Sequence, residues 1–219
     1  MERHSSGTGG AAALGGPIAA ATFVGGVAGA LALSDAPYPR PCSSPDQIRK
    51  YFSDNAGPAR VSIAGQLLSA AALGVFAIAV FRLARQSGRQ SSGIRAAALA
   101  GGVASVGTLV TSAMTSAQLT RGAADQPDVA LKLHERAFVA GGPLHGPAIG
   151  LLMAALGFAG LRTHALPRWL CAASLATATA GLLAPIALII EPAVWLVPAS
   201  RFPGLLLSAI AGAKLRQQS

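Results

Sequence analysis

Acidic side chains are scarce in this sequence, whose 219 residues include 8 Asp and Glu against 17 Lys and Arg. Charged residues make up only 11% of the chain, whereas a soluble domain usually carries about a quarter. Apolar residues make up 52%. A water-soluble fold cannot hide so much apolar surface with so few charges, so the composition predicts an integral membrane protein.

The motifs of common cofactor sites and catalytic centres are also missing. The sequence has no P-loop, no dinucleotide-binding glycine fingerprint and no GxSxG motif. The segment "HERAF" fails the HExxH zinc pattern, because Phe138 stands where the second histidine is needed. The two cysteines, Cys42 and Cys171, form no CxxC pair and no Cys/His cluster. We therefore expect no metal and no cofactor.

Six apolar stretches predict six transmembrane helices, because about 20 apolar residues cross the hydrocarbon core. We expect the helices at residues 16–33, 61–81, 96–119, 137–161, 169–190 and 192–213. The sixth stretch contains Pro198, Arg201 and Pro203, so it is expected to kink, to tilt or to lie partly in the interface. The sequence predicts an all-α membrane bundle that forms one domain over residues 1–219.

Basic loops predict the orientation of this bundle. The segment Arg82–Arg95 carries four arginines and no acid, and Arg162–Arg168 carries two arginines and no acid. Short basic loops stay in the cytoplasm, so both termini are expected on the cytoplasmic side of the plasma membrane. The net charge of +9 then reflects topology, and we expect no nucleic-acid partner. Cys42 and Cys171 fall on opposite sides and are expected not to bond each other.

The first apolar stretch has an alternative interpretation. Its end, "GALALSDAP", resembles a signal-peptide cleavage region, with the small residues Ala32 and Ser34 before Asp35. The preceding segment "MERHSSGTGG" is only weakly basic. We therefore expect this helix to be retained.

One acid, Glu191, stands in an apolar neighbourhood, "IIEPAVW". It is either a solvated interfacial carboxylate at the end of the fifth helix or a group that faces a cavity, because an ionised carboxylate beside hydrocarbon is costly. In a cavity, partial burial would keep the acid protonated and make it a usable general acid. Trp195, four residues on, is expected on the same wall if the local backbone is helical, although Pro192 favours a break.

A second candidate region is "LHERAFVAGGPLHG". His134 and His145 are eleven residues apart, close to three helical turns, so we expect both on one face with Phe138 between them. They would lie ~16 Å apart, too far to share a metal. Alternatively, His134 and Glu135 belong to a solvated helix entrance, and His145 bonds to a neighbouring helix.

A third candidate region, "IRKYFSDNAGPAR", precedes the second helix. Asp54 either takes part in a turn or helix cap or, with Tyr51 and Phe52, looks inward from a lid over the outer mouth. Polar side chains inside the predicted helices either bond between helices or line a cavity. These are Gln66, Ser69, Thr108, Thr111, Ser112, Ser116 and Gln118.

Three segments resemble small actinobacterial multi-pass membrane proteins: "YFSDNAGPARVSIAGQLL", "LKLHERAFVAGGPLHGPAIGLL" and "LRTHALPRWLCAASLATATAGLL". They cover roughly residues 48–190. In size and layout the chain also resembles the small membrane-bound terpene cyclases of actinobacteria, of the drimentine type, which act on prenylated indoles or related meroterpenoids. The resemblance implies a lipid-like prenylated substrate next to membrane lipids, and it assigns no catalytic residue.

The leading hypothesis is therefore a metal-independent terpenoid cyclase that starts a carbocation cyclisation by protonating its substrate. The missing DDxxD motif argues against ionisation of a prenyl diphosphate. Expected proton donors are Glu191 or Asp54, assisted by Glu135, His134 or His145. A carbocation is stabilised by ring faces, and the expected substrate-binding walls are Trp195, Phe138, Tyr51 and Phe52.

Two alternatives stay open. A small transporter or channel is favoured by the repeated Gly-Gly-Pro-apolar tetrad, Gly15–Ile18 and Gly141–Leu144, because broken helices in inverted repeats are typical of transporters. A non-catalytic membrane subunit or sensor would use the outer loop Asp35–Arg60 as its docking surface.

Overall fold

The computed structural model describes residues 6–88, 91–122 and 126–218. Within these ranges the chain is helical and forms no β-strand. Six helical segments are long and apolar enough to cross a membrane: Gly10–Leu33, Ala56–Gln86, Ser92–Leu119, Pro127–Thr163, Arg168–Leu188 and Pro192–Gln217. The predicted all-α membrane bundle is confirmed, and the protein is a multi-pass membrane protein.

Several spans are built from more than one helix. The first contains α1 (Ser6–Ala13) and α2 (Gly15–Leu33). The second and third are single helices, α4 (Ala56–Gln86) and α5 (Ser92–Leu119). The fourth contains α6 (Pro127–Gly141) and α7 (His145–Thr163). The fifth contains α8 (Arg168–Leu183) and the 3-10 helix η2 (Ala184–Leu188), and the sixth contains η3 (Glu191–Trp195) and α9 (Leu196–Gln217).

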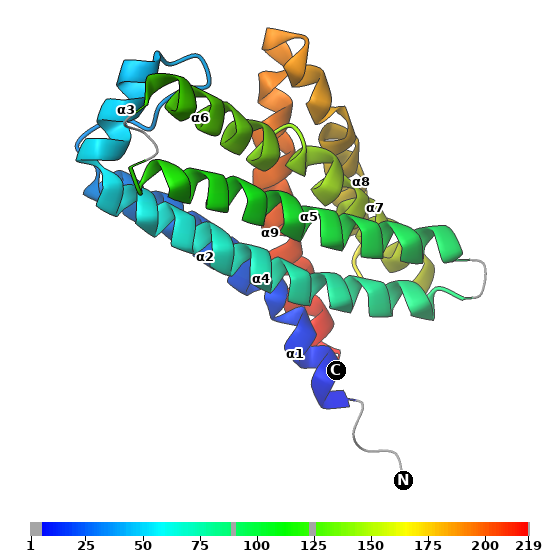
Figure 1. The fold of residues 1–219 in the computed structure, drawn as a ribbon. Helices are drawn as coiled ribbons and strands as arrows, with labels where there is room; N and C mark the ends of the chain where they lie inside the picture. The colour runs from blue at the N-terminus through cyan, green and yellow to red at the C-terminus, as the bar shows by residue number, and fades with distance from the viewer. Residues whose placement is uncertain (1–5, 89–90, 123–125, 219) are drawn as a thin grey trace.

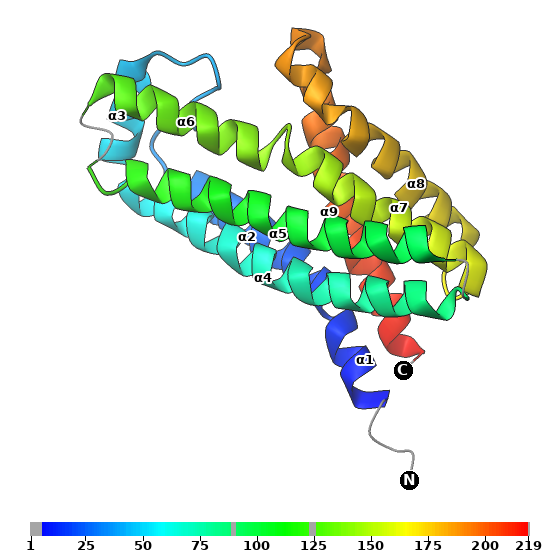
Figure 2. The same cartoon turned by 45° about the vertical axis from the view of Figure 1, so that its right-hand side comes forward.

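The main helices form a closed ring. Going round it, α2, α4, α5, α7, α8 and α9 each pack on the next, and α9 returns to α2. Figures 1 and 2 show α1 and the end of α9 at one end of the bundle and α3 (Pro45–Asp54) at the other. Six crossings would place both termini on the same side of a membrane, and the cytoplasmic orientation stays a prediction.

Two helix pairs cross at glycines. A methyl group on Gly65 of α4 would lie 2.6 Å from the Gly26 Cα of α2. A methyl group on Gly181 of α8 would lie 3.0 Å from the Gly150 Cα of α7. Such approach of two backbones is possible only where neither residue has a side chain, and it is a common way for helices to associate in lipid.

The two crossings correspond in detail. A methyl group on Gly65 would also meet the carbonyl oxygen of Thr22, one turn before Gly26. A methyl group on Gly181 would likewise meet the carbonyl oxygen of Gly146, one turn before Gly150. Both Gly-Gly-Pro tetrads lie at helix breaks, since α2 begins at Gly15 and α6 ends at Gly141. Spans one and four run in opposite directions, and the inverted repeat stays a prediction that these two crossings favour.

The break in the fourth span corrects one prediction. His134 and His145 were expected on one face of a continuous helix, but they belong to α6 and α7, which a turn at Gly142–Leu144 separates. The glycines leave the backbone free to turn, and Pro143 cannot donate a helical hydrogen bond. By contrast, α9 continues through Pro203.

The short helix α3 was not predicted as a separate element. The Gln47 N–H donates to the Ser44 hydroxyl oxygen and the Ser44 N–H donates to the Gln47 side-chain oxygen, which together cap the helix start. Ile48, Tyr51 and Phe52 are buried and form a small second core with side chains of α5 and α6. The helix thereby closes one end of the bundle.

Candidate functional site

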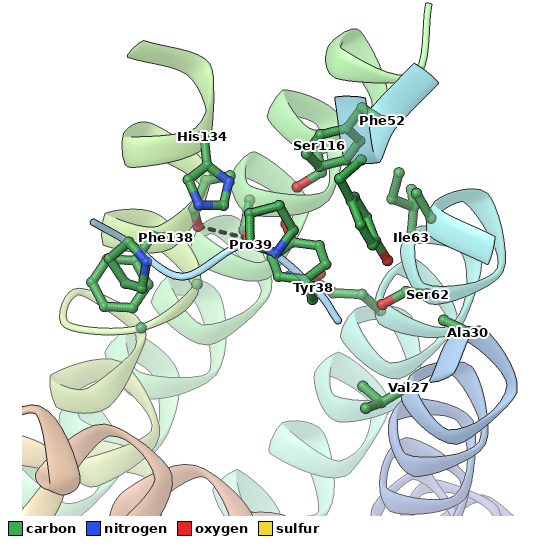
Figure 3. A pocket seen from close by; sticks show the side chains of 18 of the residues that line it. Val27, Ala30, Tyr38, Pro39, Phe52, Ser62, Ile63, Ser116, His134 and Phe138 are labelled. Atoms are coloured by element: carbon green, nitrogen blue, oxygen red, sulfur yellow. Dashed lines mark hydrogen bonds between the residues drawn. The ribbon is translucent and has the colours of Figure 1, made fainter. Parts of the chain in front are cut away.

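A cavity of about 430 Å³ lies between α2, α3, α4, α5, α6 and α9 (Figure 3). This volume falls within the range of small-molecule binding sites. Five aromatic side chains line it, namely Phe23, Tyr38, Tyr51, Phe52 and Phe138. The polar lining consists of Ser62, Gln66, Ser112, Ser116, His134 and Arg201. The lining therefore combines an apolar surface with a few polar groups, as a site for an amphiphilic molecule requires.

The loop between α2 and α3, residues 34–44, covers this cavity, and we call it the strap. Figure 3 shows Tyr38 and Pro39 of the strap with His134 on one side and Phe52 on the other. The Tyr38 ring lies edge-on to Tyr51 and Phe52, with ring centroids 5.3 Å and 5.9 Å away. Aromatic contacts thus hold the middle of the strap over the cavity.

The start of the strap is fixed by Asn55, which is 3% exposed. Its side-chain oxygen accepts hydrogen bonds from the Ser34 hydroxyl at 2.9 Å and from the Asp35 N–H at 3.1 Å. These bonds tie the end of α2 to the start of α4. The neighbouring Asp54 was the predicted site residue, whereas the structure gives the buried position to the amide.

His134 holds the far side of the strap. Its Nε2 lies 3.1 Å from the Arg40 carbonyl oxygen. A carbonyl can only accept, so Nε2 donates this bond and carries a proton. Nδ1 is buried and has no hydrogen-bond partner within the part of the chain that the structure describes. This unpaired nitrogen belongs to a residue that lines the cavity.

Arg201 lies at the opposite, deeper end of the cavity. Its Nη1 donates to the Gly141 carbonyl oxygen at 2.8 Å, and its Cζ lies 4.2 Å from the centre of the Phe23 ring. The carbonyl is available because α6 ends at Gly141 and its last carbonyls have no partner within the helix. The Arg201 Nε is buried and, among the described residues, has no acceptor.

The Arg201 charge lies well inside the membrane-spanning region. Phe23, on which it stacks, is near the middle of the first span, Gly10–Leu33. Among the described residues, no carboxylate lines the cavity and Arg201 forms no ion pair. A charge inside a membrane bundle is costly, and such residues usually serve a ligand or an ion.

Four of the nine predicted site residues meet at the cavity. Tyr51 and Phe52 reach it from α3, and His134 and Phe138 reach it from α6. The predicted lid with inward-looking Tyr51 and Phe52 is thus present, although the strap covers more of the cavity than α3 does. Phe138 and His134 lie one turn apart and face the same space (Figure 3).

The predicted acids do not join them. Asp54 and Glu135 are both exposed and are absent from the lining. Each stands on the side of its helix away from the buried stripe, which on α6 includes Leu133, His134 and Ala137. The alternative of a solvated helix entrance therefore fits Glu135 but not His134, which is 2% exposed.

The remaining predicted residues lie elsewhere. His145 is buried between α7 and α5, with its Nδ1 3.0 Å from the Thr108 hydroxyl oxygen, as the alternative of bonding to a neighbouring helix predicts. Trp195 is 76% exposed and is absent from the lining. Glu191 begins η3, but its side chain lies outside what the structure describes.

Some polar side chains of the helices form hydrogen bonds between helices and also line the cavity. The Gln66 amide donates to the Leu109 carbonyl oxygen at 3.2 Å, and the Ser112 hydroxyl donates to the Ala137 carbonyl oxygen at 2.9 Å. Both bonds join different helices and both residues line the cavity. Bonding between helices and lining a cavity, which the sequence left as alternatives, therefore occur together at Gln66 and Ser112.

Sequence reasoning missed Tyr38, Phe23 and Arg201 as cavity residues. Arg201 could have been found, because an ionisable residue within an apolar stretch is a signal for function. Tyr38 lies in a loop without periodicity, and Phe23 is one apolar residue among many in α2.

No family model matches the chain, and neither the curated proteins nor the solved structures that were compared with it include a match. In the described ranges, no group of three or more His, Cys, Asp and Glu side chains could hold a metal ion. Cys42 and Cys171 are free, the first exposed and the second buried. The cavity is therefore the feature on which a functional argument can be built.

The Tyr38 hydroxyl is expected to ionise late. Burial among the surrounding atoms raises the pKa of Tyr38 from 10.0 to about 12, although the neighbouring Ser116 hydroxyl acts in the other direction. The side chain is 46% exposed, but it lines the cavity. Because the folded-state pKa is raised, this contribution to stability is complete below pH 10 and is lost as the pH rises through 12.

A titration followed by the ultraviolet absorbance of tyrosinate checks this prediction. The late ionisation should disappear in Tyr38→Phe and remain in Tyr51→Phe, which removes the other tyrosine of the chain. A Tyr38 that ionises near pH 10 would mean that the strap leaves the cavity open to water.

Replacing His134 by alanine is expected to loosen the strap, because the bond to the Arg40 carbonyl is lost. A spin label on the exposed Cys42 of the strap, in a Cys171→Ala background, should show increased mobility in electron paramagnetic resonance spectra. Arg136→Ala, an exposed change on the same helix, serves as the control. Equal label mobility in both variants would show that the bond does not hold the strap.

Proposed function

We propose that this multi-pass protein of the plasma membrane binds an amphiphilic small molecule in the cavity beneath the strap. The observation that carries the proposal is the lining, where five aromatic rings accompany polar groups. Two of these groups have buried nitrogens with no partner among the described residues. A purely structural gap between helices would be filled by apolar side chains. Binding sites instead combine apolar walls with a few placed polar groups.

The packing of α6 supports entry from the lipid. This helix packs on α5 and α3, but in the described structure it makes no comparable contact with α2 or α9. Val27 and Leu31 of α2 and Val197 of α9 line the cavity on that side. A lipid-soluble molecule can therefore reach the cavity between helices without crossing water.

Ligand analysis of the purified protein tests the proposal. The full chain is reconstituted in nanodiscs, and native mass spectrometry and solvent extraction are used to find a co-purified amphiphile. Binding of decanoate and decanol, as probes with and without charge, is measured by calorimetry. We expect saturable binding of at least one probe at one site per chain. Absence of any bound molecule and of any probe binding would refute the proposal.

Conversion of the bound molecule by the predicted terpenoid cyclase activity is a second candidate. It is favoured by the clustering of five of the chain's eleven aromatic residues around one cavity, because ring faces stabilise carbocations. The fixed charge of Arg201 would oppose a cation nearby, so the chemistry would belong to the strap end. A proton would add to an alkene or epoxide of a prenylated substrate, and a base would remove a proton at the end.

This candidate depends on a proton donor. No carboxylate of a described side chain lines the cavity. Glu191, whose side chain the structure does not describe, is therefore the first residue to test, and the exposed Asp54 is the second. Membranes containing the protein are incubated with prenylated indoles, and products are analysed by mass spectrometry. Cyclised product that disappears in Glu191→Gln or Asp54→Asn, but not in Asp128→Asn, would support the cyclase. No product from any substrate would count against it.

Transport of the bound molecule is favoured by the two similar glycine crossings and by the two tetrads at helix breaks, because transporters commonly place their site between inverted repeats and next to broken helices. The cavity lies beside the end of α6 and is lined by α2, α4 and α5 together with α6 and α9. Uptake of labelled decanoate into proteoliposomes, beyond the passive rate of empty liposomes, tests transport. Equal rates would exclude transport of this probe.

A further inference from the structure

We infer that the deep end of the cavity, at Arg201, binds the anionic headgroup of an amphiphile whose apolar chain extends toward the strap. This inference rests on the proposed function and assigns the chemical class of its ligand. The headgroup is a carboxylate or a phosphate, and its counter-charge is the Arg201 guanidinium.

Among the described side chains that line the cavity, none balances the charge of Arg201. One nitrogen donates to the Gly141 carbonyl oxygen, and the Cζ atom lies over the Phe23 ring. Both contacts reduce the cost of placing the cation inside the bundle, but neither neutralises it. The nearby described side chains that line the cavity include serines and a glutamine but no acid. A negative charge is the missing partner, and the cavity is where it would come from.

Alternative occupants fit less well. A cationic molecule would be repelled by Arg201, and an uncharged amphiphile would fill the cavity but leave the charge unpaired. A small inorganic anion would pair with Arg201 but would leave the aromatic and aliphatic walls without a partner. An anion joined to an apolar chain satisfies both, because Arg binds carboxylates and phosphates through strong charge-assisted hydrogen bonds.

His134 provides a second point of attachment. It lies seven residues before Gly141 on α6, which corresponds to about 10 Å along the helix. Its Nδ1 is buried without a partner in the described structure and can accept a hydrogen bond. A hydroxyl group about 10 Å from the headgroup would therefore add affinity.

Four probes separate the contribution of the anionic headgroup from that of the distal hydroxyl. They are tested on the wild-type protein in nanodiscs of zwitterionic lipid, at a pH at which the carboxylate probes are ionised. Decanoate and decyl phosphate carry the anion, decanol lacks it, and 10-hydroxydecanoate adds a distal hydroxyl. Calorimetry should show at least tenfold tighter binding of decanoate or decyl phosphate than of decanol. The stronger of the two identifies the headgroup. We expect 10-hydroxydecanoate to bind several-fold more tightly than decanoate, and His134→Phe should remove this difference.

Arg201 variants locate the charge effect. Arg201→Gln should lower decanoate affinity at least tenfold and leave decanol affinity unchanged, so that the two probes bind equally. Arg201→Lys should retain part of the preference for the anion. Arg136→Gln removes an exposed charge from α6 and should behave as wild type.

The outcomes are distinguishable. If decanol binds wild type as tightly as both anions, the inference is overturned while the proposed function stands. The same holds if Arg136→Gln weakens decanoate as much as Arg201→Gln does. If no probe binds, the inference is overturned, and if no amphiphile co-purifies either, the proposed function itself fails. Should Arg201→Gln fail to fold, the comparison of charged and uncharged probes on the wild-type chain still decides.

Discussion

Replacing Val27 by tryptophan is expected to abolish ligand binding and to leave the fold intact. Val27 lies on α2, is half-buried and lines the cavity. The larger side chain would occupy space that a ligand needs, while the cavity accommodates it without displacing a neighbouring helix. Calorimetry with decanoate should show at least a tenfold rise in Kd, which corresponds to about 1.4 kcal/mol.

A matched control exists one turn earlier on the same helix. Val24 is 53% exposed, and Val24→Trp places the same indole ring on the outer surface of the bundle, where tryptophan is well tolerated in membrane proteins. Binding should remain as in wild type. If Val27→Trp binds decanoate as well as Val24→Trp does, the probe occupies a place other than this cavity.

Valine at either helix crossing is expected to destabilise the bundle strongly. At Gly65 and at Gly181 the new side chain would meet the backbone of the facing helix, and backbone cannot move aside as a flexible side chain can. Overpacking of this kind costs up to about 3 kcal/mol. Both variants should unfold at lower temperature in detergent, as followed by size-exclusion chromatography with fluorescence detection.

If the two helix crossings are equivalent, Gly65→Val and Gly181→Val should lower the unfolding temperature by similar amounts, and this comparison tests the predicted internal repeat. Gly57→Val and Gly93→Val are the controls, because a methyl group at either position would meet nothing within 4 Å. These changes should leave the unfolding temperature near that of wild type. A large effect of Gly65→Val with none from Gly181→Val would show that the two crossings are not equivalent.

The spans were predictable because membrane thickness sets the length of an apolar run. The length of an apolar run does not show where a helix begins, where it turns, or where a short polar helix lies. Hydropathy shows that residues 137–161 are apolar, but it does not show that the fourth helical segment begins at Pro127 and turns at Gly142–Leu144. It also missed α3, although Ser44 and Gln47 form a capping pattern that is visible in the sequence.

The site was predictable only in part. Tyr51, Phe52, His134 and Phe138 line the cavity, since helical periodicity places them on inward faces. The scarcity of acids in the chain does not show on which side of its helix Asp54 stands, and the structure places it on the exposed side. Which loop folds back over which helices depends on long-range contacts, such as the bond between His134 and the strap, that no local pattern contains.

The closed ring of helices sets the point in biosynthesis at which the cavity is completed. The last helix, α9, packs on both α8 and α2, and it contributes Val197 and Arg201 to the cavity. A nascent chain that still lacks this helix has neither a completed ring nor the Arg201 cation. The cavity is therefore complete only when the final helix enters the bilayer and packs on the first.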